Sequence, residues 1–168
     1  FGQEARSKGS ESYAIGRAAV TEAAATYGYA IGKGAKVISS SGYALGTSSL
    51  SSGSNSVAVG STSSTYGANS YAFGQSAYTG SSGTNAYAIG QSSQSTASAS
   101  YALGYDARAT AASSCAIGAS SRAPQTSSYA IGAGAQANGQ ESYAIGNSAS
   151  TGATSSYAIG KSALTGAS

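Results

Sequence analysis

The sequence has no histidine, methionine or tryptophan, and it has only one cysteine, Cys115, and one proline. Without histidine, the chain cannot form a histidine-based catalytic triad or zinc site. A single cysteine likewise excludes a disulfide framework or a cysteine-rich zinc site. Asp106 is the only aspartate, which excludes calcium loops built on several aspartates. We therefore expect no enzyme activity, no cofactor and no bound metal ion.

Charged residues are also scarce, with eight basic and five acidic side chains and a net charge of +3 over 168 residues. This small excess is not the clustered basic face of a nucleic-acid-binding protein. No apolar run approaches the roughly 18 residues of a membrane helix. We expect no nucleic-acid partner and no direct membrane insertion of this segment. The chain starts without methionine or a signal peptide, so we expect it to be a piece of a mature, exported protein.

Glycine, alanine and serine are abundant, and they are arranged in a repeat along nearly the whole chain. The box Tyr-Ala-Ile-Gly, with substitutions, occurs eleven times. Successive box glycines lie 14 residues apart, except for two steps of 16. The box glycines are Gly16, Gly32, Gly46, Gly60, Gly74, Gly90, Gly104, Gly118, Gly132, Gly146 and Gly160. Because no internal boundary interrupts this register, residues 1–168 are predicted to form a single repeat domain.

Residue types alternate along each unit. Two residues before the box glycine stands alanine in every unit, whereas the residue before the glycine is apolar and the one three before it is tyrosine in nine of the eleven units. The residues three and five positions after the glycine are always small or valine, whereas the residue four positions after it varies freely. A limited choice of residue types at every second position is typical of β-strands. We therefore predict an all-β parallel stack of coils of about 14 residues, each with two short strands and two tight turns.

The alternation leaves open which face of the Tyr-Ala-Ile strand points into the coil. Either the alanines point inward and the Tyr and Ile side chains meet neighbouring subunits, or Tyr and Ile fill the coil and the alanines lie at the subunit interface. Two-residue turns would hold the strands close together, which favours the first arrangement. In both, the tyrosines are structural, and Cys115, which occupies a Tyr position, is expected to be a small buried apolar residue. Because the Tyr and Ile-type residues of the boxes are few for a chain of this length, we expect contacts between subunits to stabilise the coil.

Two segments carry a family resemblance. Residues Asn55–Gly60 and Ser142–Ala149 resemble the head repeat of YadA-like trimeric autotransporter adhesins, whose motif reads roughly Asn-Ser-Val-Ala-Ile-Gly-x-x-Ser. The resemblance extends over about residues 9–168, and this chain departs from it by placing Tyr where the family usually has Val or Ile. It implies a left-handed parallel β-roll that assembles as a homotrimer. It also implies a location on the bacterial cell surface, anchored in the outer membrane through parts of the parent protein outside this chain.

The same resemblance implies an adhesin that binds host-cell receptors or extracellular-matrix proteins. Coils of 14 residues leave no room for a ligand-sized pocket, so we expect binding on the side surface. Two places are candidates: the freely varying position four after the glycine, and the two 16-residue units, whose extra residues lie near 22–26 and 79–85. The candidate ligand-contact residues are Tyr27, Lys36, Leu50, Tyr78, Arg108 and Arg122. An ordinary solvated surface is the competing interpretation of both places.

Other functions known for coils of this kind agree less well with the sequence. A structural trimeric fibre or phage fibre without receptor binding is the main alternative. Ice binding would need a regular outward file of threonines, but the threonines are irregular and are predicted to point inward. A left-handed acyltransferase helix would show six-residue periodicity and usually a catalytic histidine, and neither is present.

Overall fold

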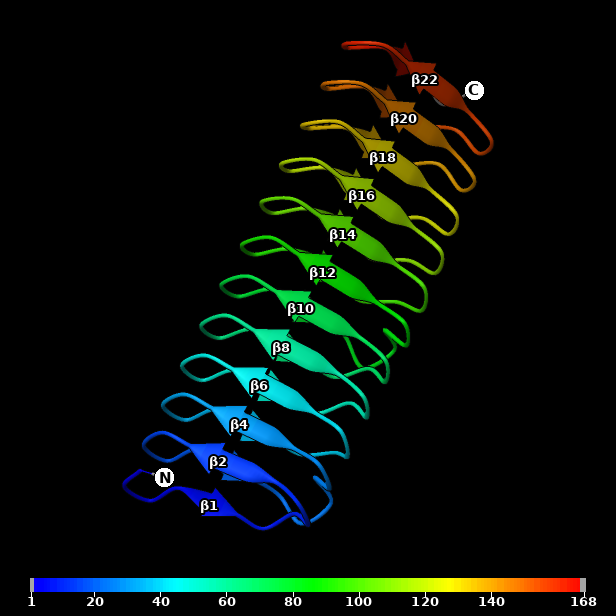
Figure 1. The fold of residues 1–168 in the computed structure, drawn as a ribbon. Helices are drawn as coiled ribbons and strands as arrows, with labels where there is room; N and C mark the ends of the chain where they lie inside the picture. The colour runs from blue at the N-terminus through cyan, green and yellow to red at the C-terminus, as the bar shows by residue number, and fades with distance from the viewer. Residues whose placement is uncertain (1, 167–168) are drawn as a thin grey trace.

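In the computed structural model, residues 2–166 form an elongated stack of flat coils, each lying on the one before it (Figure 1). Within this range the chain contains strands and turns but no helix. Odd-numbered strands form one parallel sheet of twelve strands, the odd sheet, and even-numbered strands form another of eleven, the even sheet. Each coil therefore contributes one strand to each sheet, as the repeat predicts.

The strands of the odd sheet are two residues long. They are β1 Arg6–Ser7, β3 Val20–Thr21, β5 Lys36–Val37, β7 Leu50–Ser51, β9 Ser64–Thr65, β11 Tyr78–Thr79, β13 Gln94–Ser95, β15 Arg108–Ala109, β17 Arg122–Ala123, β19 Gln136–Ala137, β21 Ser150–Thr151 and β23 Leu164–Thr165. The even sheet has strands of three residues. They are β2 Tyr13–Ile15, β4 Tyr29–Ile31, β6 Tyr43–Leu45, β8 Val57–Val59, β10 Tyr71–Phe73, β12 Tyr87–Ile89, β14 Tyr101–Leu103, β16 Cys115–Ile117, β18 Tyr129–Ile131, β20 Tyr143–Ile145 and β22 Tyr157–Ile159.

The structure adds one strand that the box count does not predict. Gly2 has a φ of 138°, in the range of the box glycines, and Arg6 on β1 pairs in register with Val20 on β3. Only Phe1 of this sequence stands before Gly2, so a search for the four-residue box does not find this half-coil. The repeat therefore begins before residue 9, where the resemblance to the head motif starts.

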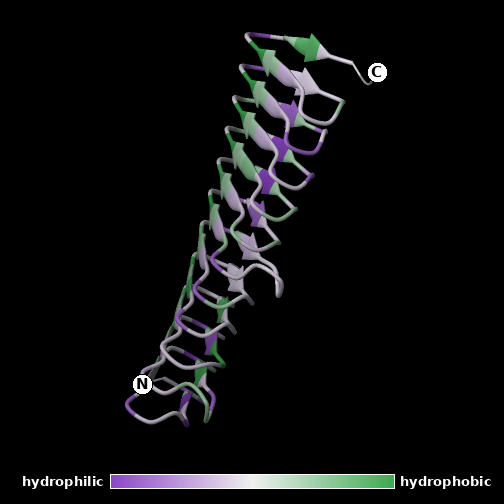
Figure 2. Cartoon of the chain, turned by 90° about the vertical axis from the view of Figure 1, so that its right-hand side faces the viewer, coloured by the Kyte–Doolittle hydropathy of each residue, from purple (hydrophilic) through white to green (hydrophobic). Residues whose placement is uncertain are grey.

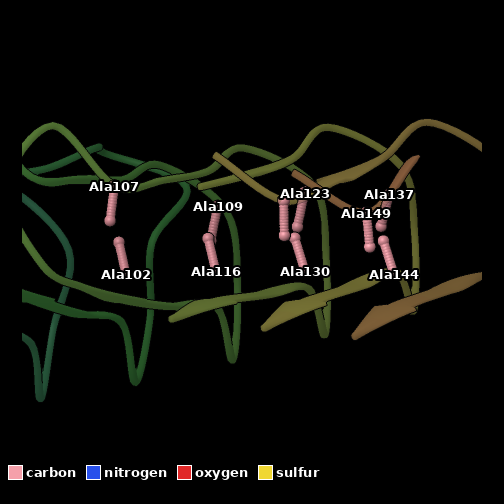
Figure 3. Close-up of a cluster of buried hydrophobic side chains, with 10 residues drawn as sticks. Ala102, Ala107, Ala109, Ala116, Ala123, Ala130, Ala137, Ala144 and Ala149 are labelled. Atoms are coloured by element: carbon pink, nitrogen blue, oxygen red, sulfur yellow. The ribbon is translucent and has the colours of Figure 1, made fainter. Parts of the chain in front are cut away.

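Alanines from the two sheets face each other inside the coils. Ala130, in the middle of β18, and Ala123, on β17, are both fully buried, and their side chains point toward one another (Figure 3). The same arrangement joins Ala116 to Ala109. This confirms the direction of the side chains in the first of the two predicted arrangements: the box alanines point inward, and the Tyr and Ile side chains lie on the outer side of the even sheet.

Serine and threonine hydroxyl groups, together with Val37, fill much of the rest of the interior. A serine four residues before the box glycine donates a hydrogen bond to the carbonyl three residues earlier, as Ser128 does to Gln125 and Ser142 to Gly139, both at 2.6 Å. Across the interior, the Thr151 hydroxyl donates to Ser142 at 2.8 Å. These partners satisfy buried polar groups that would otherwise destabilise the fold. The threonines on the odd strands thus point inward as predicted, whereas the serine file was not predicted.

Besides the box glycine, each complete coil contains two further residues with positive φ, and most of these are not glycine. Ala18, an exposed turn residue, has a φ of 56°, and the next residue, Ala19, is fully buried without a positive φ. For an L-residue other than glycine, the left-handed region costs about 1–2 kcal/mol.

Replacing Ala18 with glycine should therefore raise the free energy of unfolding by roughly 1 kcal/mol, because glycine enters this region without that penalty. Replacing Ala19 with glycine should lower it by about 1–2 kcal/mol, since it removes a buried methyl group and adds backbone freedom. Urea unfolding followed by circular dichroism measures both. A loss of stability in both variants would contradict the assignment of strain to Ala18.

Candidate functional site

A single file of side chains runs along the outer side of the odd sheet. It consists of the residues four after each box glycine, which are stacked in register from strand to strand. We call this set the outer file: Val20, Lys36, Leu50, Ser64, Tyr78, Gln94, Arg108, Arg122, Gln136, Ser150 and Leu164. All of these residues are half-buried or exposed. Figure 2 shows hydrophilic residues on several successive strands along this side and more hydrophobic strands along the opposite side.

The structure separates the six predicted contact residues. Lys36 and Leu50 are neighbours in the outer file, and Arg108 and Arg122 form a second neighbouring pair. Tyr78 lies between the two pairs, with one other file residue on each side. Tyr27 is outside the file, in the turn before β4, with a φ of 57°. The six residues therefore do not form one cluster.

The two longer turns project from the coil, but they do not carry the tyrosines. The extra residues are Ala23 and Ala24 in the first turn and Ser81 and Ser82 in the second, and all four are exposed. A backbone hydrogen bond from Ala25 to Glu22, at 2.9 Å, closes the first extra turn. The corresponding bond in the second joins Gly83 to Gly80. The inserted segments thus present only small side chains.

Lys36 is already engaged in an ion pair. Its Nζ lies 3.1 Å from Glu22 Oε1, and Lys8 Nζ donates to Glu22 Oε2 at 2.7 Å. The hydrogen bonds from Lys8 and then from Lys36 hold the pKa of the Glu22 carboxyl below its ordinary value. Lys36 is therefore less available to an external ligand than an unpaired cation would be.

The arginine pair borders a shallow hollow of about 430 Å³ on the odd sheet. Asp106 Oδ1 accepts hydrogen bonds from Nε and Nη2 of Arg108, at 3.1 and 2.9 Å. Asp106 Oδ2 lies 4.0 Å from Nη2 of Arg122. The hollow is lined by Arg108, Thr110, Arg122, Pro124, Gln136 and Asn138. Three of these, Thr110, Pro124 and Asn138, lie six residues after a box glycine. This position was not among the predicted contact positions.

The opposite side of the rod, which we call the even face, is apolar. It carries the outward Tyr and Ile-type side chains of the even strands, and neighbouring tyrosine rings stack with centroids 4.8–5.2 Å apart. Val57 and Cys115 interrupt the tyrosines, leaving three groups of three rings. Many of these side chains are substantially exposed, with Tyr101 at 46% and Leu103 at 45%.

Cys115 is half-buried in the single chain, not fully buried as predicted. Because it occupies a Tyr position, three residues before its glycine, it points to the same side as the tyrosines and lies on the even face. It lines an apolar hollow of about 240 Å³ together with Tyr101 and Ile117. Burial raises the pKa of the Cys115 thiol, which favours its protonated form.

Among residues 2–166, no three His, Cys, Asp or Glu side chains come together in a way that could hold a metal ion. In the same part of the chain, no helix is long and apolar enough to cross a bilayer.

The repeats of this chain are similar to those of a known protein family. The model of the YadA head domain repeat matches residues 40–63, 81–100, 95–121 and 123–149, which together make up more than half of the chain. Comparison with curated protein sequences returned no match. The matched segments contain seven of the eleven box glycines, together with the inward alanines and the outward apolar residues of the same seven boxes. The chain therefore belongs to the family of YadA head domain repeats.

Proposed function

We propose that this chain is the head segment of a trimeric adhesin on the bacterial surface, anchored in the outer membrane through other parts of its parent protein. The head binds host-cell receptors or extracellular-matrix proteins through the side of the rod and has no catalytic role. The observation that carries this proposal is the difference between the two outer sides. The even face is uniform and apolar, whereas the outer file on the odd sheet changes its chemistry from coil to coil.

The even face is suited to contacts between subunits. Its Tyr and Ile-type side chains form a continuous exposed stripe, and such stripes on soluble proteins commonly mark interaction surfaces. The interior contains mostly Ala, Ser and Thr, so the bulky apolar side chains lie outside the coil, where packing against further copies of the chain would remove them from water. We propose a left-handed coil with three copies packed through the even face; the number three and the handedness rest on the family.

In this arrangement the odd sheet faces outward in all three subunits. The outer file and the two longer turns then form a long surface that is displayed three times. Weak contacts repeated in this way can raise avidity by about 10²–10⁴-fold. Binding should therefore depend on assembly as well as on the side chains of the outer file.

Adhesion of bacteria that display the parent protein tests this proposal. The test variant combines Tyr27→Asn, Tyr78→Ser, Arg108→Gln and Arg122→Gln with deletion of Ala23–Ala24 and Ser81–Ser82. We expect adhesion to host cells or matrix proteins to fall about tenfold or more because several contacts are lost together. Surface display and melting temperature should be retained, since all of these groups are on the outside of the coil.

A control variant carries matched changes on the turn that follows the box glycines: Lys33→Gln, Gln75→Ala, Gln91→Ala and Lys161→Gln. It loses the same two charges, and it should adhere like the parent protein. Unchanged adhesion of the folded test variant would favour a structural fibre without receptor binding. A folded monomer at micromolar concentration in analytical ultracentrifugation would contradict the proposed trimer.

A further inference from the structure

We propose that the hollow beside Arg122 binds an anionic group of an acidic polysaccharide, either a carboxylate or a sulfate ester. This inference rests on the proposed function, because it names the chemical class of ligand that the odd sheet would recognise. It is drawn from the charge, the hydrogen-bonding groups and the interrupted strand ladder at one place on that sheet.

The first observation is a local excess of positive charge. Arg108 and Arg122 are paired in register on the neighbouring strands β15 and β17, and like charges in this arrangement repel each other. Within residues 2–166, Asp106 is the only acidic partner of either arginine. Its closest contacts are both with Arg108, so the single carboxylate balances only one of the two guanidinium charges. An anion beside Arg122 would relieve the repulsion.

The second observation is the set of neutral donors around Arg122. Gln136 follows Arg122 in the outer file on β19, and Asn138 lies two residues further along the chain. Thr110 lines the other end of the hollow. Amide and hydroxyl groups can donate hydrogen bonds to an anionic oxygen or exchange them with sugar hydroxyls. The guanidinium fork of Arg122 supplies the charge-assisted contact, with a planar geometry that matches carboxylate and sulfate oxygens.

The third observation is a gap in the backbone ladder under the hollow. At the position six after the glycine, a backbone N–H normally donates to the next coil, as Thr110 does to Ala123 and Asn138 to Thr151. Pro124 occupies this position in the coil between them and has no N–H group. Only Arg122 and Gln136 are paired between β17 and β19, whereas the neighbouring strand pairs β15–β17 and β19–β21 are each paired at two positions. The regular surface is therefore interrupted at the hollow.

The lining favours a polysaccharide over an acidic protein segment. Pro124 is the only apolar side chain among the six lining residues. Protein partners usually bind through tyrosine, tryptophan and arginine anchors in well-packed, desolvated pockets, whereas this hollow is shallow and has no aromatic residue in its lining. A chain of hydroxylated rings with anionic substituents can instead use the arginine, both amides and the threonine hydroxyl at once.

Binding of the purified protein to four polymers tests this inference. Dextran sulfate and polygalacturonate carry sulfate and carboxylate groups respectively, uncharged dextran is the neutral control, and polyglutamate is the acidic polypeptide. We expect binding to at least one of the two anionic polysaccharides, weaker binding to polyglutamate and none to dextran. Absence of binding to both anionic polysaccharides, or tighter binding to polyglutamate, would overturn the inference.

Variants show whether the hollow is the binding site. Arg122→Gln should weaken polysaccharide binding about tenfold or more, as expected for the loss of charge-assisted hydrogen bonds. Arg6→Gln is the matched control, because Arg6 occupies the equivalent position on β1, in the same sheet, without these neighbours. The double variant Gln136→Ala and Asn138→Ala keeps the net charge and should weaken binding several-fold. Equal effects of Arg122→Gln and Arg6→Gln, or no effect of the double variant, would reduce the interaction to unspecific charge attraction and overturn the inference.

These results are separable from those of the adhesion assay. If the combined outer-file variant loses adhesion while Arg122→Gln leaves polysaccharide binding unchanged, the adhesin proposal stands and the ligand class is wrong. If Arg122→Gln weakens polysaccharide binding but the combined outer-file variant adheres normally, the anion site stands and the adhesin proposal fails.

Discussion

Replacing Ala130 with leucine should lower the stability of the rod far more than replacing Gln136 with leucine. Ala130 is fully buried in the middle of β18 and faces Ala123 of β17 (Figure 3). A leucine there would force its larger side chain between two sheets that meet through alanine side chains. Overpacking of this kind costs about 1–3 kcal/mol in a core that can adjust. In a trimer the cost arises in every subunit.

Gln136 is the control because it lies on the next odd strand, with its side chain exposed in the outer file. A leucine at this position requires no movement of either sheet, and exposed substitutions usually change stability by less than about 0.5 kcal/mol. Thermal unfolding followed by circular dichroism compares the two variants. Equal melting temperatures would mean that the interior can accommodate large side chains, which contradicts the packing described here.

Replacing the box glycine Gly118 with alanine should cause a second large loss of stability. Gly118 has a φ of 125°, a backbone conformation that costs an alanine about 1–3 kcal/mol. In addition, the new Cβ would lie 2.6 Å from both the carbonyl carbon and the oxygen of Gly132 in the next coil. Because backbone atoms on both sides are held by the strand ladder, neighbouring coils would have to move apart.

Gly160 provides a matched control in this 168-residue chain, since it has the same place in the box and a φ of 124°, but among residues 2–166 no atom lies within 4 Å of a Cβ added there. Both alanine variants carry the backbone penalty, and only Gly118→Ala adds the clash between coils. We therefore expect the melting temperature to fall further for Gly118→Ala than for Gly160→Ala. Equal losses would show that backbone conformation alone, and not the stacking distance, requires glycine at the box position.

The sequence was sufficient to predict the architecture because each unit repeats the same constraints. The invariant alanine, the bulky residues on either side of it and the box glycine identify the strand, its two faces and the turn. The serine file was harder to detect, since Gly28, Gly42 and Ala86 take its place in three units. Its role becomes clear only when the hydroxyl is seen to reach a carbonyl three residues earlier.

The candidate binding surface could be predicted only in part. The freely varying position correctly indicated an outward file, and it included both arginines of the hollow. Asn138 and Pro124 were missed because their contribution depends on how the turn after each odd strand is placed beside the next one. The ion pairs of Glu22 with Lys8 and Lys36 were also missed, because Lys8 and Glu22 lie six residues after Gly2 and Gly16, outside the freely varying position.

The in-register stacking of the coils has a consequence for the length of the protein. Each strand pairs only with strands of the coil directly before or after it, so every interaction between coils extends over one repeat. Gain or loss of a complete unit of 14 residues therefore rejoins surfaces that already fit one another. A change of one residue within a box strand would instead turn its alanine to the outer face of the sheet. Rods of this kind can thus vary in steps of a whole coil, and genetic duplication or deletion of units can adjust the length of the rod.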